Sequence, residues 1–150
     1  MKTVIAGSRE IDLQIVVDFA IKLAYLNEID EIISGDAVGP DKLGAAWAEA
    51  REIPVKHFPP NYELYGSPRA QFKRNDDMAI YCDQAVIIWD GESNGTRHMM
   101  KCLRNHDKPF TLIQIKVDYE REAGTIVKLY RFANGTTFKE YPDGKYEKLN

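Results

Sequence analysis

The stretch Glu31-Ile32-Ile33-Ser34-Gly35-Asp36-Ala37-Val38-Gly39-Pro40-Asp41 decides the fold that we expect for this chain. The pair Ile32-Ile33 is typical of a buried strand, and Gly35 and Gly39 supply a turn. Pro40 follows this turn and favours the first position of a helix. A strand, a glycine turn and a helix in this order present backbone N–H groups and a helix N-terminus to an anion, usually a phosphate.

The same pattern returns twice elsewhere in the chain. The apolar run 85–89 leads into Asp90-Gly91-Glu92-Ser93-Asn94-Gly95-Thr96, and the apolar residues 3–6 lead into Gly7-Ser8-Arg9. The carboxyl ends of parallel strands share one edge of a sheet, and ligands bind there. We therefore expect the three turns to lie together and to bind a nucleotide-like small molecule.

Strands and helices alternate along most of the chain. We expect the first helix to be capped by Asp12, and residues 61–66 to form a polar loop. The second helix should bury an apolar stripe made of Leu43, Ala46, Trp47 and Ala50. The pattern predicts strands at 3–6, 31–34, 55–58, 84–89 and 110–115, and helices at 12–26, 40–50, 67–81 and after Gly95. This alternation predicts an α/β fold with a Rossmann-like, doubly wound parallel sheet of about five strands.

The residues after 115 follow a different pattern. Residues 125–132 and 136–141 alternate in the manner of strands, and Asn134-Gly135 between them is a strong hairpin signal. We therefore divide the chain into a nucleotide-binding domain at 1–115 and a C-terminal β-hairpin extension at 116–150. An isolated two-stranded ribbon is only marginally stable in water, so we expect this antiparallel meander to pack on the first domain or on a partner subunit.

The composition limits the classes of protein. The 150 residues carry a formal net charge of −3 and have a sequence pI of about 5.6, which argues against nucleic acid as a partner because that role favours a basic face. No apolar stretch reaches the ~20 residues that cross a bilayer, and no signal-peptide pattern opens the chain. We therefore expect a cytoplasmic protein with no membrane contact.

The cysteines and histidines do not indicate a cofactor or a metal. Cys82 and Cys102 are the only cysteines, and they are typical of reduced thiols in a cytosolic protein. His57 and His106 lack partners at the spacing of metal ligands. We expect no zinc site and assign no cofactor.

Four motifs in order resemble a known superfamily. They are Gly7-Ser8-Arg9, the stretch 34–41, Arg74-Asn75-Asp76-Asp77-Met78 and the stretch 90–96. Together they resemble the SLOG superfamily of Rossmann-like nucleotide-binding proteins, which includes the Lonely Guy phosphoribohydrolases and DprA. The resemblance covers residues 1 to about 115 and is closest to the small bacterial and phage branch with GSR and SGGA-GAD-like motifs.

The resemblance also implies an oligomer. Lonely Guy proteins dimerise through helices beside the site, and the predicted helix 67–81 carries Phe72, Met78, Ile80 and Tyr81 for such a contact. We expect a homodimer or a higher homo-oligomer.

The departures from the family concern its chemistry. Lonely Guy enzymes carry a GGxGTxxE motif with a catalytic glutamate, and the corresponding position here is Met99, which cannot act as a base. The family motif RKxxM keeps its arginine as Arg74 but has Asn75 in place of the lysine. Asp36 stands where this branch usually has glycine. The fold and ligand class therefore carry over better than N-glycosidic hydrolysis, and we assign no catalytic residue.

The residues expected to contact the ligand come from these motifs. Each has an ordinary structural alternative: the glycines in the turns themselves, the arginines in surface salt bridges, and Asp90 as a cap of its turn. Trp89 and Tyr62 are candidates for stacking on a base. The expected contacts are Gly7, Ser8, Arg9, Ser34, Gly35, Asp36, Gly39, Asp41, Arg74, Asn75, Asp90, Gly91, Ser93, Gly95 and Thr96.

Three classes of function follow. The first is a sensing or sequestration module that binds a nucleotide or a nucleotide-derived ligand without turning it over. The second is a phosphoribohydrolase-like hydrolase of a nucleoside monophosphate, for which the nearby acids Glu92, Asp36 and Asp41 lie on different turns. The third is a DprA-like nucleic-acid-binding protein. Met99 argues against the second class and the acidic pI against the third, so the sequence favours the first.

Overall fold

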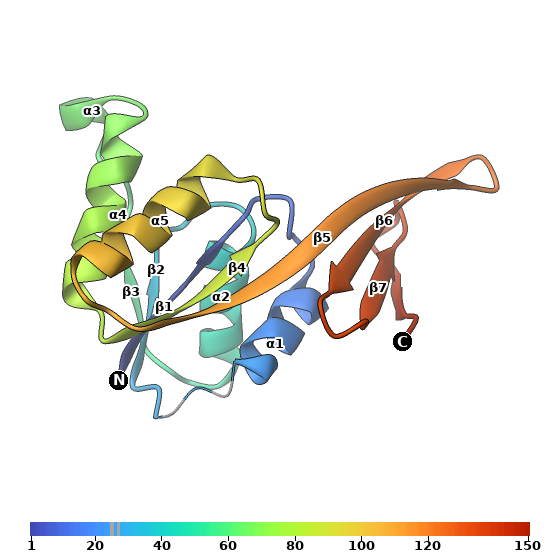
Figure 1. Ribbon diagram of the computed structural model, residues 1–150, viewed down its shortest axis with the longest axis horizontal. Coiled ribbons are helices and arrows are strands. Elements are labelled where there is room, and N and C mark those ends of the chain that lie inside the picture. The colour runs from blue at the N-terminus through green and yellow to red at the C-terminus, as the bar shows by residue number, and fades with distance from the viewer. Residues whose placement is uncertain (25, 27) are drawn as a thin grey trace.

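The computed structural model describes residues 1–24, 26 and 28–150 of the chain. In this described part the protein is α/β, with one mixed sheet of eight strands in the order β3-β2-β1-β4-β5-β6-β7-β8 (Figure 1). Parallel pairs join β1 to β2 and β4, β2 to β3, and β4 to β5. Antiparallel pairs join β5 to β6, β6 to β7 and β7 to β8. The strands are β1 (Lys2–Gly7), β2 (Glu31–Ser34), β3 (Val55–His57), β4 (Gln84–Trp89), β5 (Phe110–Glu122), β6 (Thr125–Phe132), β7 (Thr137–Glu140) and β8 (Tyr146–Lys148).

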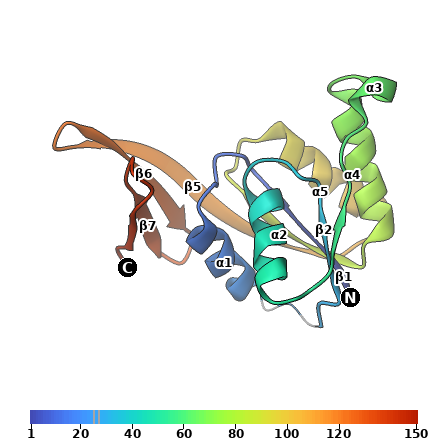
Figure 2. The same cartoon turned by 180° about the vertical axis from the view of Figure 1, so that it is seen from behind.

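Helices cover both faces of the parallel part (Figures 1 and 2). Along a strand successive side chains point to opposite faces, so β1 sends Ile5 to the core of α1 and α2 and Val4 to the core of α4 and α5. A short helix, α3, precedes α4. The helices are α1 (Gln14–Leu23), α2 (Pro40–Ala50), α3 (Tyr62–Tyr65), α4 (Arg69–Tyr81) and α5 (Asn94–Asn105).

The chain changes direction across the sheet between β1 and β4. From β1 it builds outward through β2 to β3, and it then returns to place β4 and β5 on the other side of β1. The carboxyl ends of β1 and β4 consequently lie side by side, with Gly7 opposite Ile88. In open α/β sheets the connections diverge at such a point and leave a crevice.

The strand β5 continues far beyond its parallel partner. It pairs with β4 as far as Gln114 and with β6 from Ile115 onward, so it crosses the expected boundary at residue 115 without a break. The antiparallel strands pack on α1 through aromatic rings. Phe19 has its ring centroid 5.0 Å from that of Phe132 and 5.6 Å from that of Phe138.

Several element boundaries differ from expectation. The residue at the N-cap of α1 is Leu13 and not Asp12, and no side chain caps this helix. The expected end of that helix includes residue 25, which lies outside the described residues. The segment expected as a loop contains α3, which Asn61 caps by accepting a hydrogen bond from the N–H of Leu64 at 3.1 Å.

The predicted buried stripe of α2 was half right. Leu43 and Trp47 are partly buried and pack on the core, but Ala46 and Ala50 are exposed, and Gly44, Ala45 and Ala48 are buried instead. A Cβ on Gly44 would lie 2.6 Å from Cγ2 of Ile5. The helix therefore approaches β1 too closely for larger side chains on that face.

Two further observations concern the described residues. Cys82 and Cys102 are buried and free. None of the described helices is long and apolar enough to span a bilayer.

Candidate functional site

A cleft of about 420 Å³ lies at the carboxyl ends of β1 and β4, beside the first turns of α4 and α5. It is placed where the strand order reverses, which is where α/β sheets bind ligands. Nine of the expected contact residues line it: Gly7, Arg9, Asp41, Arg74, Asn75, Asp90, Ser93, Gly95 and Thr96. A larger hollow of about 520 Å³ between α1 and α2 contains none of the expected residues and is lined mainly by apolar side chains.

The other six expected residues do not line the cleft. They are Ser8, Ser34, Gly35, Asp36, Gly39 and Gly91. Ser34 is buried, donates from its hydroxyl to the carbonyl of Asp41 at 2.9 Å, and accepts from the N–H of Asp36 at 3.2 Å. Gly39 has φ of +96°, and a Cβ there would lie 2.9 Å from the carbonyl oxygen of Ser8. Hydrogen bonds and close packing within the fold therefore account for Ser34 and Gly39.

Gly35 and Gly95 differ in what explains them. A Cβ on Gly35 would lie 2.6 Å from Nη1 of Arg74 and 2.6 Å from Oδ2 of Asp41, so glycine leaves room for both side chains beside this turn. A Cβ on Gly95 would meet no other atom within 4 Å, although Gly95 lies in α5 and lines the cleft. Gly95 is the second residue of α5. No neighbouring side chain requires a glycine at this position.

Asp90 and Ser93 organise the turn that begins α5. One carboxylate oxygen of Asp90, Oδ1, accepts from the N–H groups of Glu92 and Ser93, both at 2.9 Å, and from the hydroxyl of Ser8 at 3.1 Å. Burial raises the pKa of Asp90, but these hydrogen bonds outweigh it and leave the pKa below its usual value. Ser93 caps the helix by accepting from the N–H of Thr96 at 3.4 Å. Asp90 thus serves as the cap of its turn.

Of the three acids considered for hydrolysis, Asp36, Asp41 and Glu92, only Asp41 lines the cleft, and it is buried. Burial raises its pKa from 3.8 to about 6, against the opposing effects of Arg74 and of the N–H groups of Gly7 and Ala37. Asp36 instead pairs with Nδ1 of His57 at 2.6 Å, outside the cleft. Glu92 does not line the cleft either.

Arg74 bridges α4 to the turn after β2. Its Nη1 donates to the carbonyl of Gly35, and its Nε donates to Oδ1 of Asn75 at 3.0 Å. Asn75 is itself buried, with Nδ2 3.1 Å from Nδ1 of His98. Within the described residues no carboxylate lies close enough to Arg74 to form an ion pair. The positive charge of this guanidinium is therefore available to bind an anion in the cleft.

Nine residues that line the cleft were not among the expected contacts, and Glu10, Gln71 and Phe72 are the three of them that matter most for a ligand. The ring of Phe72 is 43% exposed and packs against His98, with the ring centroids 4.3 Å apart. Oε1 of Gln71 is buried and has no hydrogen-bond partner in the described part of the chain. Helical spacing could have signalled Gln71 and Phe72, since they precede Arg74 and Asn75 by three residues on the same helix. Nothing local distinguishes Glu10.

The aromatic residues proposed for stacking lie elsewhere. Trp89 and Tyr62 are absent from the cleft lining, and Nε1 of Trp89 donates to the carbonyl of Ser93 at 3.1 Å. Met99, at the position of the family's glutamate, is buried and lines the cleft.

Among the described residues, no three His, Cys, Asp or Glu side chains are arranged to hold a metal ion. Comparisons of the chain with protein-family models, with curated proteins and with solved structures gave no match.

Proposed function

We propose that this protein binds a nucleotide or a nucleotide-derived anion in the cleft at the carboxyl ends of β1 and β4, as a sensing or sequestration module. The observation that carries the proposal is Gly95. It leaves open space over the first turn of α5, where it is the second residue of the helix. Space without a neighbouring residue lets a ligand approach the backbone N–H groups of a helix N-terminus.

The charges and rings of the cleft support the same ligand class. Arg9 and Arg74 supply positive charge beside the α5 turn, and guanidinium groups match phosphate geometry. The exposed ring of Phe72 offers a flat apolar surface for a base at the α4 side of the cleft. A cleft of about 420 Å³ is in the size range of small-molecule sites.

A thermal-shift screen against mono-, di-, tri- and cyclic nucleotides and ADP-ribose derivatives tests the proposal. A ligand that binds the folded state raises the melting temperature by mass action. Gly95→Val should remove the shift, because its branched side chain fills the space over the turn.

Gly91→Ala is not a suitable control, since Gly91 has φ of +87°, a backbone conformation that strains any other residue. Gly66 does not line the cleft, but its φ of +70° would strain an alanine, so Gly66→Ala is not a suitable control either. The matched control is therefore Ala46→Val, an exposed substitution in the middle of α2. Unchanged nucleotide binding by a folded Gly95→Val protein would count against the site.

A second candidate function is favoured by Asp41 alone. A buried carboxyl in a cleft, with its pKa raised to about 6, is suited to proton transfer. The protein would then be a phosphoribohydrolase-like hydrolase of a nucleoside monophosphate. Since Met99 replaces the glutamate of the Lonely Guy motif, we expect binding without release of free base. Multiple turnovers that Asp41→Asn abolishes would favour the hydrolase instead.

We also propose that residues 1–115 form a Rossmann-like, doubly wound domain of the SLOG superfamily in a cytoplasmic, homo-oligomeric protein. The order β3-β2-β1-β4-β5 and the helices on both faces support this proposal. The DprA-like alternative has less support, because the cleft of this acidic protein combines Arg9 and Arg74 with carboxylates.

A further inference from the structure

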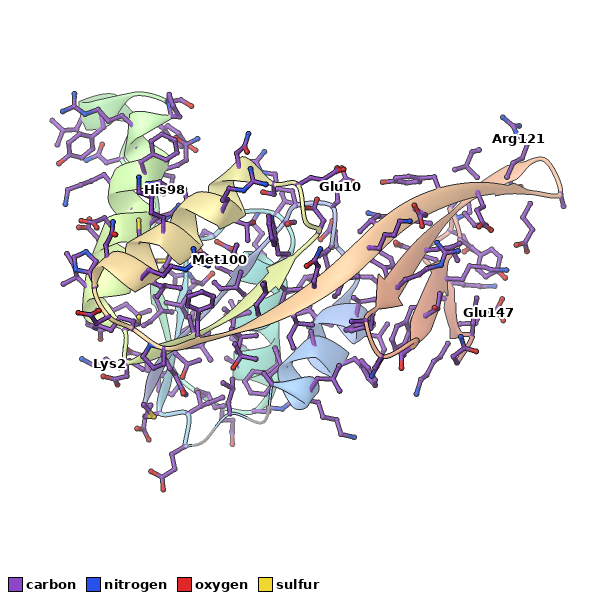
Figure 3. The ribbon with its side chains drawn as sticks, viewed as in Figure 1. Lys2, Glu10, His98, Met100, Arg121 and Glu147 are labelled. Atoms are coloured by element: carbon purple, nitrogen blue, oxygen red, sulfur yellow. The ribbon has the colours of Figure 1, made fainter. Side chains whose placement is uncertain are left out.

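Glu10 places a carboxylate at the edge of a cleft that we assign to an anion. It follows Arg9 directly in the turn after β1, and both residues line the cleft. Figure 3 labels Glu10 on this turn, near the long strand β5. A negative charge at this position repels a phosphate unless another group compensates it.

The C-terminal strands supply that compensation. The hydroxyl of Tyr119 on β5 donates to Oε2 of Glu10 at 2.5 Å. Nζ of Lys128 on β6 lies 3.6 Å from the same carboxylate oxygen and also donates to the backbone carbonyl of Glu10. These contacts join residues 109 and 118 positions apart in the sequence.

Lys128 is itself held in place. Its side chain is only 17% exposed, and its Nζ lies 5.0 Å from the ring centroid of Tyr130 and 5.7 Å from that of Tyr119. A half-enclosed ammonium with aromatic neighbours is less free to move than one on the open surface. Its charge therefore acts on Glu10 at a fixed place.

We propose that the C-terminal β extension is part of the binding machinery: Lys128 and Tyr119 are positioning residues that hold and neutralise Glu10, so that the cleft accepts an anion. This inference rests on the proposed function, because it assumes an anionic ligand. It gives the strands after residue 115 a role in affinity as well as in folding.

Lys139 provides a matched control. Its side chain is 15% exposed, and its Nζ lies 2.7 Å from Oε2 of Glu122, on strands of the same extension. Neither Lys139 nor Glu122 lines the cleft. Lys128→Met and Lys139→Met each remove one half-buried lysine from an ion pair, and only the first leaves an uncompensated carboxylate at the cleft.

The experiment measures binding of inorganic phosphate and of the four common nucleoside 5′-monophosphates by calorimetry at low salt. We expect Lys128→Met to lower the affinity for the phosphate-containing probes about tenfold. Lys139→Met should change this affinity by less than about twofold. Adding Glu10→Gln to Lys128→Met should restore most of the affinity, because the repelling charge is gone. If the contact between Lys128 and Glu10 only stabilised the fold, Glu10→Gln would not restore the affinity.

Hydrogen exchange supplies a readout without ligand. The N–H of Ile11 donates to the carbonyl of Ser8 at 3.0 Å and so reports on the turn that holds Glu10. This amide should exchange faster in Lys128→Met and in Tyr119→Phe than in Lys139→Met.

The outcomes separate the two proposals. If the unmodified protein binds neither these probes nor any nucleotide or ADP-ribose derivative of the thermal-shift screen, the proposed function is wrong, and the exchange rates alone decide whether the C-terminal extension holds this turn. If the unmodified protein binds a probe and neither Lys128→Met nor Tyr119→Phe changes its affinity, only the present inference is overturned. Weakening by Lys128→Met without rescue by Glu10→Gln would also overturn it.

Discussion

At the scale of single residues, Asp41 links the stability of the fold to the chemistry of the cleft. Its carboxyl is buried, and desolvation raises its pKa from 3.8 to about 6. Between these two values the folded protein binds more protons than the unfolded chain. The free energy of unfolding should therefore fall as the pH rises from about 4 to about 6.

Asp41→Asn should remove this part of the pH dependence. The substitution keeps the shape of the side chain and cannot ionise, so we expect it to raise the free energy of unfolding at pH 7 by about 1–3 kcal/mol. Urea unfolding at pH 4, 5, 6 and 7 measures the effect, with Asp143→Asn on the exposed turn before β8 as the control. An equal decline with pH in the Asp41→Asn and unmodified proteins would contradict the assignment.

At the scale of elements, the contact between α1 and the antiparallel strands ties the C-terminal extension to the rest of the molecule. Phe132 and Phe138 are almost fully buried, and both pack on Phe19 of α1. They belong to the same apolar core as Val16 and Ala20, so this core extends from the parallel strands into the extension.

Phe132→Ala should lower the free energy of unfolding by about 3–5 kcal/mol, as expected when a buried ring is replaced by a cavity. Ile126→Ala is the control on the same strand: Ile126 is 47% exposed, so its replacement should change stability by less than about 1 kcal/mol. Denaturant unfolding monitored by circular dichroism measures both. Similar small losses in the two variants would mean that the extension contributes little to the core.

At the scale of the whole molecule, α4 presents apolar side chains at the surface. Of the four residues proposed for a dimer contact, Phe72 and Ile80 are 43% and 54% exposed. The proposal was wrong for Met78, which is 1% exposed and lies in the core. Tyr81 packs on Phe58 and donates from its hydroxyl to Glu31 at 2.6 Å.

We predict that the protein forms a homodimer through the exposed side of α4. Light scattering at micromolar concentration should give a mass near twice the 17.1 kDa of one chain. Ile80→Glu should shift this mass toward one chain, because a charge at an apolar contact is costly to bury. Ile126→Glu, on the exposed part of β6, should leave it unchanged. A mass of one chain for the unmodified protein would refute the dimer.

The sequence by itself determined where most of the strands and helices lie and where the glycine turns fall, but not α3 or the length of β5. The strands at 31–34 and 84–89 and the turns that follow them were confirmed, because apolar runs, glycine and proline act over a few neighbouring residues. Nine of the fifteen expected contact residues also line the cleft, since the carboxyl ends of parallel strands meet at one edge.

Only the tertiary structure decided which segments that are distant in the sequence contact one another. The close approach of α2 to β1 explains why Gly44 and not Ala46 is buried, and the continuation of β5 beyond β4 brings Lys128 to Glu10. The burial that raises the pKa of Asp41 likewise depends on segments from several parts of the chain. Packing distance, strand length and desolvation are properties of the assembled molecule, so they cannot be predicted from the local residue pattern.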